Sequence, residues 1–304
     1  MTIANPTVRT LSTTAFATLL LIAFMMGANH VAARLAFNNG VDVATAVTAR
    51  SAVTAVVVAG LLWLYKVPLT LQPRHRRALP AIGMLVAVQS LCLYSSVARL
   101  PVALALLAFN TYPLFAAGWS ALIYRQPPQR RVLMAMPVML AGLALALDVL
   151  GAASGLGAAG QWGRIGVGVA FAVAAAATFG LALVLTQHEA GDLDGRLRTF
   201  STMALVGLLA GAGALAQGGF HWPQAALGWG ALAALTFLYG TAFTIMFTVL
   251  PRLGVVGNSA IMNIEPIFAL VLAWAVLGQT IAAMQVLGGL VVVATVMWLG
   301  LRRA

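Results

Sequence analysis

Apolar residues form ten long runs along the chain, and short polar segments separate them. A transmembrane helix needs about 20 consecutive apolar residues, and most of the runs reach or approach that length. We therefore predict an all-α polytopic membrane protein with ten transmembrane helices. The predicted helices cover approximately residues 12–33, 43–65, 78–98, 101–124, 131–148, 164–187, 199–217, 226–249, 254–277 and 281–301.

Composition supports the membrane assignment. The chain has 304 residues, of which 62% are hydrophobic and only 8% are charged, whereas a soluble domain carries about 25% charged residues. A net charge of +11 would suggest nucleic acid in a soluble protein, but the basic residues here lie between the apolar runs. We therefore expect a lipid bilayer around the protein and no nucleic-acid partner. The single cysteine, Cys92, excludes an intrachain disulfide.

Lysine and arginine predict the orientation, because they are enriched in cytoplasmic loops. With the N-terminus in the cytoplasm, thirteen basic residues fall inside and three fall outside. Both termini are therefore predicted to be cytoplasmic. The three outside residues are Arg34, Arg99 and Arg164.

The chain contains two related units, which we place at residues 1–150 and 151–304. Residues 98–147 align with residues 251–300 without a gap and share ten identities, and the same offset places Gly27 on Gly180. Each unit has five predicted helices, so an odd number of crossings inverts the second copy in the membrane. Inverted repeats are common in secondary transporters, which bind substrate near the membrane midplane between the repeats. The two units are therefore expected to form one integral bundle without a soluble domain.

Two charged residues lie inside apolar runs, where a charge is costly and often functional. Glu265 could bind a substrate ammonium, carry a proton or gate the pathway, or serve a structural role. Arg50 could bind a substrate carboxylate through two hydrogen bonds, or it could pair within the bundle or extend outward to the interface. A direct pair between Arg50 and Glu265 is an open alternative.

Further polar residues are candidates to line a substrate cavity. Asn110 and Asn263 match across the repeats, as do Pro113 and Pro266, whereas Tyr112 is the counterpart of Glu265. Each proline removes a helical hydrogen bond, and we predict that both act as hinges. His30 lies near the end of the first predicted helix, and we expect it at the membrane interface. The other cavity candidates are Asn29, Tyr94, Tyr239 and Asn258.

These features together resemble the drug/metabolite transporter superfamily, specifically its EamA-type exporters. The resemblance covers the whole chain and rests on several short motifs. The motifs are Gly27-Ala28-Asn29, Ala49-Arg50, Tyr112-Pro113-Leu114-Phe115, Glu265-Pro266-Ile267-Phe268-Ala269-Leu270 and Leu277-Gly278-Gln279. Two positions depart from the family pattern: Met26 stands where tryptophan is frequent, and Gln279 stands where glutamate is frequent. Because Gln279 is not acidic, no coupling role can be placed in this turn.

The resemblance implies a bacterial inner-membrane transporter that exports small metabolites, with amino acids a well-known substrate class. It also implies a central cavity. The inverted repeats favour alternating access around that cavity, and we expect no cofactor. A transporter of cationic drugs or other metabolites is the alternative. A membrane-embedded enzyme is a distant one, because the sequence has no H-E-x-x-H or G-x-S-x-G motif and no pair of intramembrane carboxylates. We therefore predict no catalytic residue and no metal site.

Overall fold

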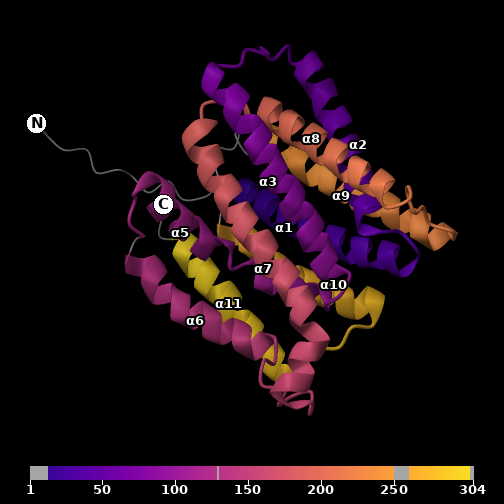
Figure 1. The fold of residues 1–304 in the computed structure, drawn as a ribbon, viewed down its shortest axis with the longest axis vertical. Helices are drawn as coiled ribbons and strands as arrows, with labels where there is room; N and C mark the ends of the chain where they lie inside the picture. Colours follow the sequence, from indigo (N-terminus) through magenta and orange to yellow (C-terminus); the bar gives the residue numbers. More distant parts are fainter. Residues whose placement is uncertain (1–12, 129, 250–259, 302–304) are drawn as a thin grey trace, which may run out of the picture.

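The fold is a bundle of helices, seen in a computed structural model that describes residues 13–128, 130–249 and 260–301 (Figure 1). The described part contains α-helices and one 3-10 helix. They are α1 (Thr13–Asn38), α2 (Val43–Leu64), α3 (Pro73–Val97), α4 (Val102–Phe109), α5 (Tyr112–Tyr124), α6 (Arg130–Ala146), α7 (Gly157–Glu189), α8 (Gly195–Ala216), α9 (Ala226–Thr248), η2 (Ala260–Ile264), α10 (Glu265–Leu277) and α11 (Ala283–Leu301).

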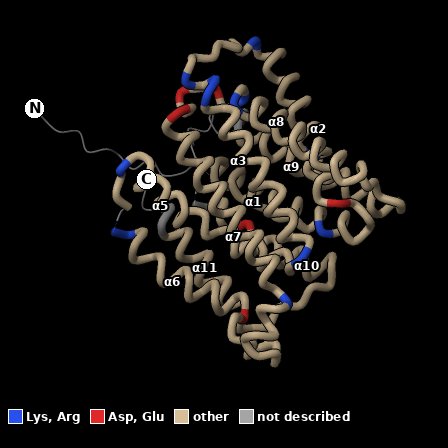
Figure 2. Tube along the Cα trace, viewed as in Figure 1, with Lys and Arg blue, Asp and Glu red and all other residues tan. Residues whose placement is uncertain are grey.

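The length and composition of the helices suit a membrane. Seven described helical segments are long and apolar enough to span a bilayer, and the segments Ile261–Leu277 and Ala283–Trp298 are shorter apolar helices. Charged residues lie mainly at the ends of the bundle and in its loops, and few lie in its middle (Figure 2). A helix satisfies most of its main-chain polar groups within its own segment, which suits hydrocarbon.

The predicted helix at 101–124 is interrupted near its middle. Helix α4 ends at Phe109, and α5 begins at Tyr112. Pro113 lies in the first turn of α5 and has no N–H to offer the carbonyl of Phe109, so a continuous helix would lose a hydrogen bond there. The predicted helix at 254–277 shows the same pattern, because η2 precedes α10 and Pro266 lies in the first turn of α10. Its first residues, 254–259, lie outside the described residues.

The strongest helix packing joins one repeat to the other. Helix α1 packs on α9 and α10, while its counterpart α7 packs on α3 and α5. Helices α2 and α8 pack together, as do α6 and α11, which lie side by side at one edge of the bundle (Figure 1). The two repeats therefore interleave, and the space between them is bounded by helices from both.

Gly27 and Gly180 show how closely the repeats correspond. A Cβ atom added to Gly27 would lie 3.0 Å from the backbone N of Ala269 and 3.0 Å from the carbonyl O of Glu265. A Cβ atom on Gly180 would lie 2.8 Å from N of Ala116 and 3.0 Å from O of Tyr112. The two glycines therefore make equivalent contacts, because each residue of one set lies 153 positions from its counterpart in the other. Glycine lets the helix backbones approach this closely, as small residues do in membrane bundles generally.

Gln279, in the turn before α11, has a structural role in capping another helix, which the sequence did not predict. Its side-chain Oε1 accepts a hydrogen bond from the backbone N–H of Val102, at 3.1 Å. Val102 is the first residue of α4, and the first N–H groups of a helix have no partner within the helix. Gln279 from the second repeat therefore caps a helix of the first.

Candidate functional site

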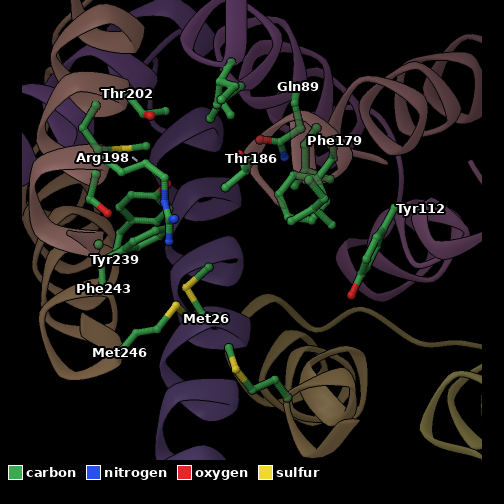
Figure 3. A pocket seen from close by; sticks show the side chains of 18 of the residues that line it. Met26, Gln89, Tyr112, Phe179, Thr186, Arg198, Thr202, Tyr239, Phe243 and Met246 are labelled. Atoms are coloured by element: carbon green, nitrogen blue, oxygen red, sulfur yellow. Dashed lines mark hydrogen bonds between the residues drawn. The ribbon is translucent and has the colours of Figure 1, made fainter. Parts of the chain in front are cut away.

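A cavity of about 680 Å³ lies between the two repeats. Its walls come from α1, α2, α3, α4, α5, α7, α8, α9, η2 and α10, and α6 and α11 contribute no described residue to it. Figure 3 shows Tyr239, Phe243, Met246 and Met26 on one side of the open space and Tyr112 and Phe179 on the other. Pockets for small molecules have volumes of about 300–1,000 Å³ and mostly apolar walls with a few polar groups, so this cavity suits a small metabolite.

Arg50 is the buried cation of the cavity wall. Its residue is only 2% exposed, and its guanidinium lies over two aromatic rings, 3.9 Å from the centre of Tyr239 and 4.6 Å from that of Tyr94. These are favourable cation–π contacts. No acidic side chain in the described ranges forms an ion pair with Arg50, and its Nε and Nη1 atoms have no hydrogen-bond partner. The guanidinium therefore neither pairs with a carboxylate nor extends to the surface.

Glu265 is paired with His30. The two side chains approach to 3.3 Å, from Oε1 of Glu265 to Nε2 of His30, and both line the cavity. The expectation that His30 lies at the interface is wrong. Helix α1 continues to Asn38, beyond the predicted end at residue 33, so His30 lies inside the helix and is only 4% exposed. A signal existed in the spacing, because His30 follows Gly27 by one helical turn and shares its face.

Tyr94 connects these two groups. Its ring packs edge-on against His30, with centroids 5.6 Å apart, and lies beneath the guanidinium of Arg50. Its hydroxyl donates to Oδ1 of Asn29 at 3.0 Å. The order Arg50, Tyr94, His30, Glu265 therefore separates the guanidinium of Arg50 from the carboxylate of Glu265 by two aromatic side chains.

An aromatic cluster forms another part of the wall. Phe179 of α7 packs against Phe109 and Tyr112, with ring centroids 5.3 and 5.1 Å apart. The hydroxyl of Tyr112 donates to Oδ1 of Asn263 at 3.3 Å, which links the interruption of the α4–α5 span to η2. Phe109 and Phe179 were not predicted as site residues, because the sequence does not show whether an apolar residue in an apolar run faces a cavity.

The structure brings most of the predicted site residues to this cavity. Glu265, Arg50, Asn263, Asn110, Tyr112, Tyr94 and Tyr239 line it. Asn29 is buried behind Tyr94 and does not line the cavity. Asn258 lies outside the described residues. Pro113 and Pro266 mark the starts of α5 and α10.

The cavity extends toward the loop between α7 and α8. Gly191, Leu193 and Asp194 of that loop line it, together with Arg196 and Arg198. No described residue in the loops at the opposite end, 39–42, 98–101, 217–225 and 278–282, belongs to the lining. The cavity therefore reaches one end of the bundle and stops short of the other.

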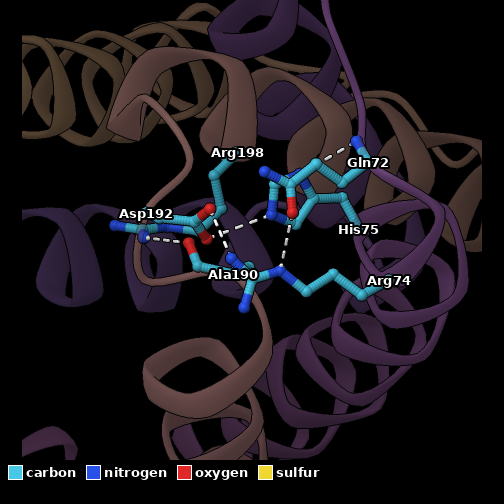
Figure 4. Close-up of polar contacts among 6 residues, drawn as sticks. All are labelled: Gln72, Arg74, His75, Ala190, Asp192 and Arg198. Carbon is cyan, nitrogen blue, oxygen red and sulfur yellow. Dashed lines mark hydrogen bonds and ion pairs between the residues drawn. The ribbon is translucent and has the colours of Figure 1, made fainter.

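Asp192 connects the α7–α8 loop to α3 beside this mouth. Its carboxylate pairs with Arg74 and lies 3.0 Å from Nε2 of His75, while Arg198 donates to the carbonyl of Ala190 at 3.1 Å (Figure 4). The hydrogen bond from His75 lowers the pKa of Asp192 below its ordinary value, and the bond from Arg74 adds to that effect. One contact set thus joins the first repeat to the second at the open end.

A matching contact joins the repeats at the opposite end. Nδ1 of His221, in the loop before α9, lies 2.8 Å from Oδ2 of Asp42, which caps the start of α2. In addition, Arg34 of α1 donates to the carbonyl of Val97 at 2.8 Å, at the end of α3. Each end of the bundle therefore has an aspartate–histidine contact between the repeats, from Asp192 in the α7–α8 loop to His75 in the first turn of α3 at one end and from Asp42 to His221 at the other.

The chemistry available in the cavity is binding. Its walls offer basic and acidic side chains, a histidine, amide groups and aromatic surface. Within residues 13–128, 130–249 and 260–301, no group of three or more His, Cys, Asp and Glu side chains is placed to hold a metal ion.

Comparison with known proteins agrees with this architecture. The profile described as "EamA-like transporter family" matches twice, at residues 13–147 and 166–301. No curated protein matches the chain. A solved structure described as "Crystal structure of protein" superposes with a TM-score of 0.63 at 16% identity, covering 97% of this chain and 100% of the other. At that identity the likeness concerns the fold alone.

Proposed function

The chain belongs to the EamA-like transporter family and is a multi-pass membrane transporter, and we propose that it exports amino acids and similar small metabolites across a bacterial inner membrane. In this proposal ten spans cross the bilayer as two inverted five-helix units, and α4–α5 and η2–α10 each count as one span. Transport proceeds by alternating access, in which the cavity opens to each side in turn. Pro113 and Pro266 serve as the hinges at the two interrupted spans.

The cavity between the repeats is the observation that carries this proposal. It reaches the α7–α8 loop and is bounded at the other end by the contacts of Asp42 and Arg34. The open end carries Arg74, Arg76 and Arg77, and the positive-inside rule assigns such an end to the cytoplasm. An exporter that has not yet loaded substrate needs a cavity with this access.

An amino acid fits the lining because groups of both charges occur together. Glu265 can receive an ammonium and Arg50 a carboxylate, while Phe109, Phe179 and the methionines accept an apolar side chain. A cationic drug is the second candidate, supported by Glu265 alone. The cation of Arg50 in the same cavity disfavours it, because like charges repel at short range.

Counterflow in proteoliposomes tests the proposal. The purified protein is reconstituted with a panel of amino acids inside, and exchange with labelled external amino acid is followed, with a parallel panel of cationic compounds. We expect exchange of one or more amino acids above the rate of protein-free vesicles. Exchange of cationic compounds without any amino acid would replace this function with the alternative, and varying the imposed pH gradient would distinguish proton coupling from facilitated diffusion.

A further inference from the structure

Arg50 is a buried cation that lacks an anion. We propose that Arg50 is the receptor for a carboxylate of the transported substrate, so that a carboxylate is obligatory for binding. This inference rests on the proposed function in one respect, namely that the cavity is where substrate binds. It goes further by stating which chemical group the cavity selects and which it rejects.

The cost of burying Arg50 supports a ligand role. A charge removed from water without a partner is strongly unfavourable, and breaking a buried ion pair by removing one partner is strongly destabilising for the same reason. The rings of Tyr94 and Tyr239 recover part of this cost through cation–π contact. Nε and Nη1 have no hydrogen-bond partner. A carboxylate entering from the cavity would supply the missing negative charge.

The unpaired groups around the cavity have a consistent chemical bias. Besides Nε and Nη1 of Arg50, Nδ2 of Asn110 and Nδ1 of His30 are buried without a partner and belong to residues that line the cavity. The Arg50 and Asn110 atoms are donors, whereas Nδ1 of His30 is a donor or an acceptor according to the tautomer. A carboxylate has two oxygens with about four lone-pair sites and no hydrogen to donate, whereas an ammonium has donors only. The surplus of donors therefore selects an acceptor-rich ligand.

The remaining lining defines the rest of the ligand. Glu265 lines the same cavity beyond Tyr94 and His30 from Arg50, so the lining carries a carboxylate as well as the guanidinium. Phe109 and Phe179 lie on the aromatic part of the wall. The chemical class that satisfies all three regions is a zwitterion with an apolar side chain.

Binding to the wild-type protein tests the carboxylate requirement directly. The full chain is purified in detergent, and the shift of its thermal unfolding midpoint is measured against phenylalanine, phenylalaninamide, phenethylamine and 3-phenylpropanoate. A matched leucine set is run in parallel. We expect the two carboxylates of a set to raise the midpoint, because a ligand that binds only the folded state stabilises it. We expect the amide and the amine to bind at least about tenfold more weakly, because they leave the guanidinium unpaired.

Variants at Arg50 then assign the selectivity to this side chain. Arg50→Gln is expected to weaken carboxylate binding by roughly 30-fold or more and to abolish the preference for acid over amide. Arg50→Lys keeps the charge but loses the planar fork, so it should keep the preference with reduced affinity. Arg34→Gln is the matched control, because Arg34 is a partly buried arginine whose guanidinium donates to the carbonyl of Val97 and which does not line the cavity. It should keep the full acid-over-amide preference.

Each result decides the matter. Equal binding of acid, amide and amine to the wild-type protein overturns the inference, and so does an acid preference that survives in Arg50→Gln. If no carboxylate of either set binds, the inference is likewise wrong. The wild-type ligand series remains decisive even if an Arg50 variant does not fold. The proposed function has its own test. If carboxylates bind but no amino acid exchanges in vesicles, export is refuted and the Arg50 site is retained. If amines exchange as well as amino acids, the Arg50 site is refuted and export is retained.

Discussion

Oε1 of Glu265 lies 3.3 Å from Nε2 of His30, and the two side chains face the same cavity from different repeats. The contact makes the carboxylate a shared feature of both halves of the molecule. Substrate arriving with an ammonium group would compete with His30 for this carboxylate.

Replacing Glu265 by glutamine removes the charge and keeps the shape. The amide oxygen can still accept a hydrogen bond from His30, so we expect the thermal unfolding midpoint to change little. Amino-acid counterflow should fall by about tenfold or more, which corresponds to the loss of a charge-assisted interaction of roughly 1.5–3 kcal/mol. The matched control is Glu189→Gln, because Glu189 accepts from Tyr124 at 2.7 Å and is not among the cavity-lining residues. Undiminished counterflow in Glu265→Gln would restrict Glu265 to a structural role.

Alanine at Gly27 or at Gly180 should destabilise the bundle by similar amounts. The added Cβ would meet backbone atoms at 3.0 Å for Gly27 and 2.8 Å for Gly180, and overpacking of this kind costs about 1–3 kcal/mol. The measurement is the thermal unfolding midpoint of each variant in detergent. Gly118→Ala is the control, since a Cβ there meets nothing within 4 Å and alanine favours a helix. A destabilisation at one of the two glycines alone would show that the contacts are not equivalent.

The hydrogen bond from Val102 to Gln279 can be tested from both directions. Gln279→Ala leaves the first N–H of α4 without its acceptor, which typically costs about 0.5–2 kcal/mol. Gln279→Glu keeps an acceptor and adds a negative charge beside a helix N-terminus, which is favourable by about 0.3–1 kcal/mol. Unfolding midpoints should therefore rank glutamate at or above glutamine, and both above alanine. An alanine variant as stable as the original would mean that water replaces the cap at no cost.

The contact of His75 with Asp192 predicts a pH dependence with a definite sign. The pKa of Asp192 is lowered in the folded protein, first by the hydrogen bond from His75. A carboxyl whose folded pKa lies below its unfolded pKa, about 3.9 for aspartate, contributes stability above the unfolded value. That contribution is lost as the pH falls through the lower, folded pKa.

Comparison of the original protein with Asp192→Asn isolates this contribution. The difference between their unfolding midpoints should be constant near neutral pH and should shrink as the pH falls below about 4. Asp148→Asn provides a comparison at a site away from the mouth, because the pKa of Asp148 is lowered mainly by backbone hydrogen bonds from Ala153 and Ser154. A midpoint difference for Asp192→Asn that does not depend on pH would contradict the assignment.

The sequence predicted the fold best where a residue type favours a single structural role. Apolar run lengths predicted the helices, and the matched Gly27 and Gly180 predicted a repeat whose contacts the structure bears out. The interruption before Tyr112 was harder to foresee, because a proline permits either a kink or a new helix start. The helix ends were the weakest part, and one misplaced end was enough to put His30 at the interface.

Only the polar and charged residues of the site could be predicted from the sequence. Glu265 and Arg50 stood out because charges are rare in apolar runs. Their neighbours did not, since whether Arg50 meets Glu265 or the rings of Tyr94 and Tyr239 depends on how distant helices are rotated. Likewise Phe109 and Phe179 lie in apolar runs whether they face lipid or cavity, and no single-sequence signal separates the two.

The interleaving of the repeats has a consequence for the order in which the protein is made. Helix α1 packs chiefly on α9 and α10, so its partners emerge from the ribosome long after it does. At about 5–20 residues per second, synthesis of α9 follows synthesis of α1 by roughly 10–40 s. Throughout that interval α1 must wait in the membrane with His30 lacking Glu265, although a polar side chain in hydrocarbon is costly. The first repeat therefore reaches its final packing only after the second half of the chain has been made.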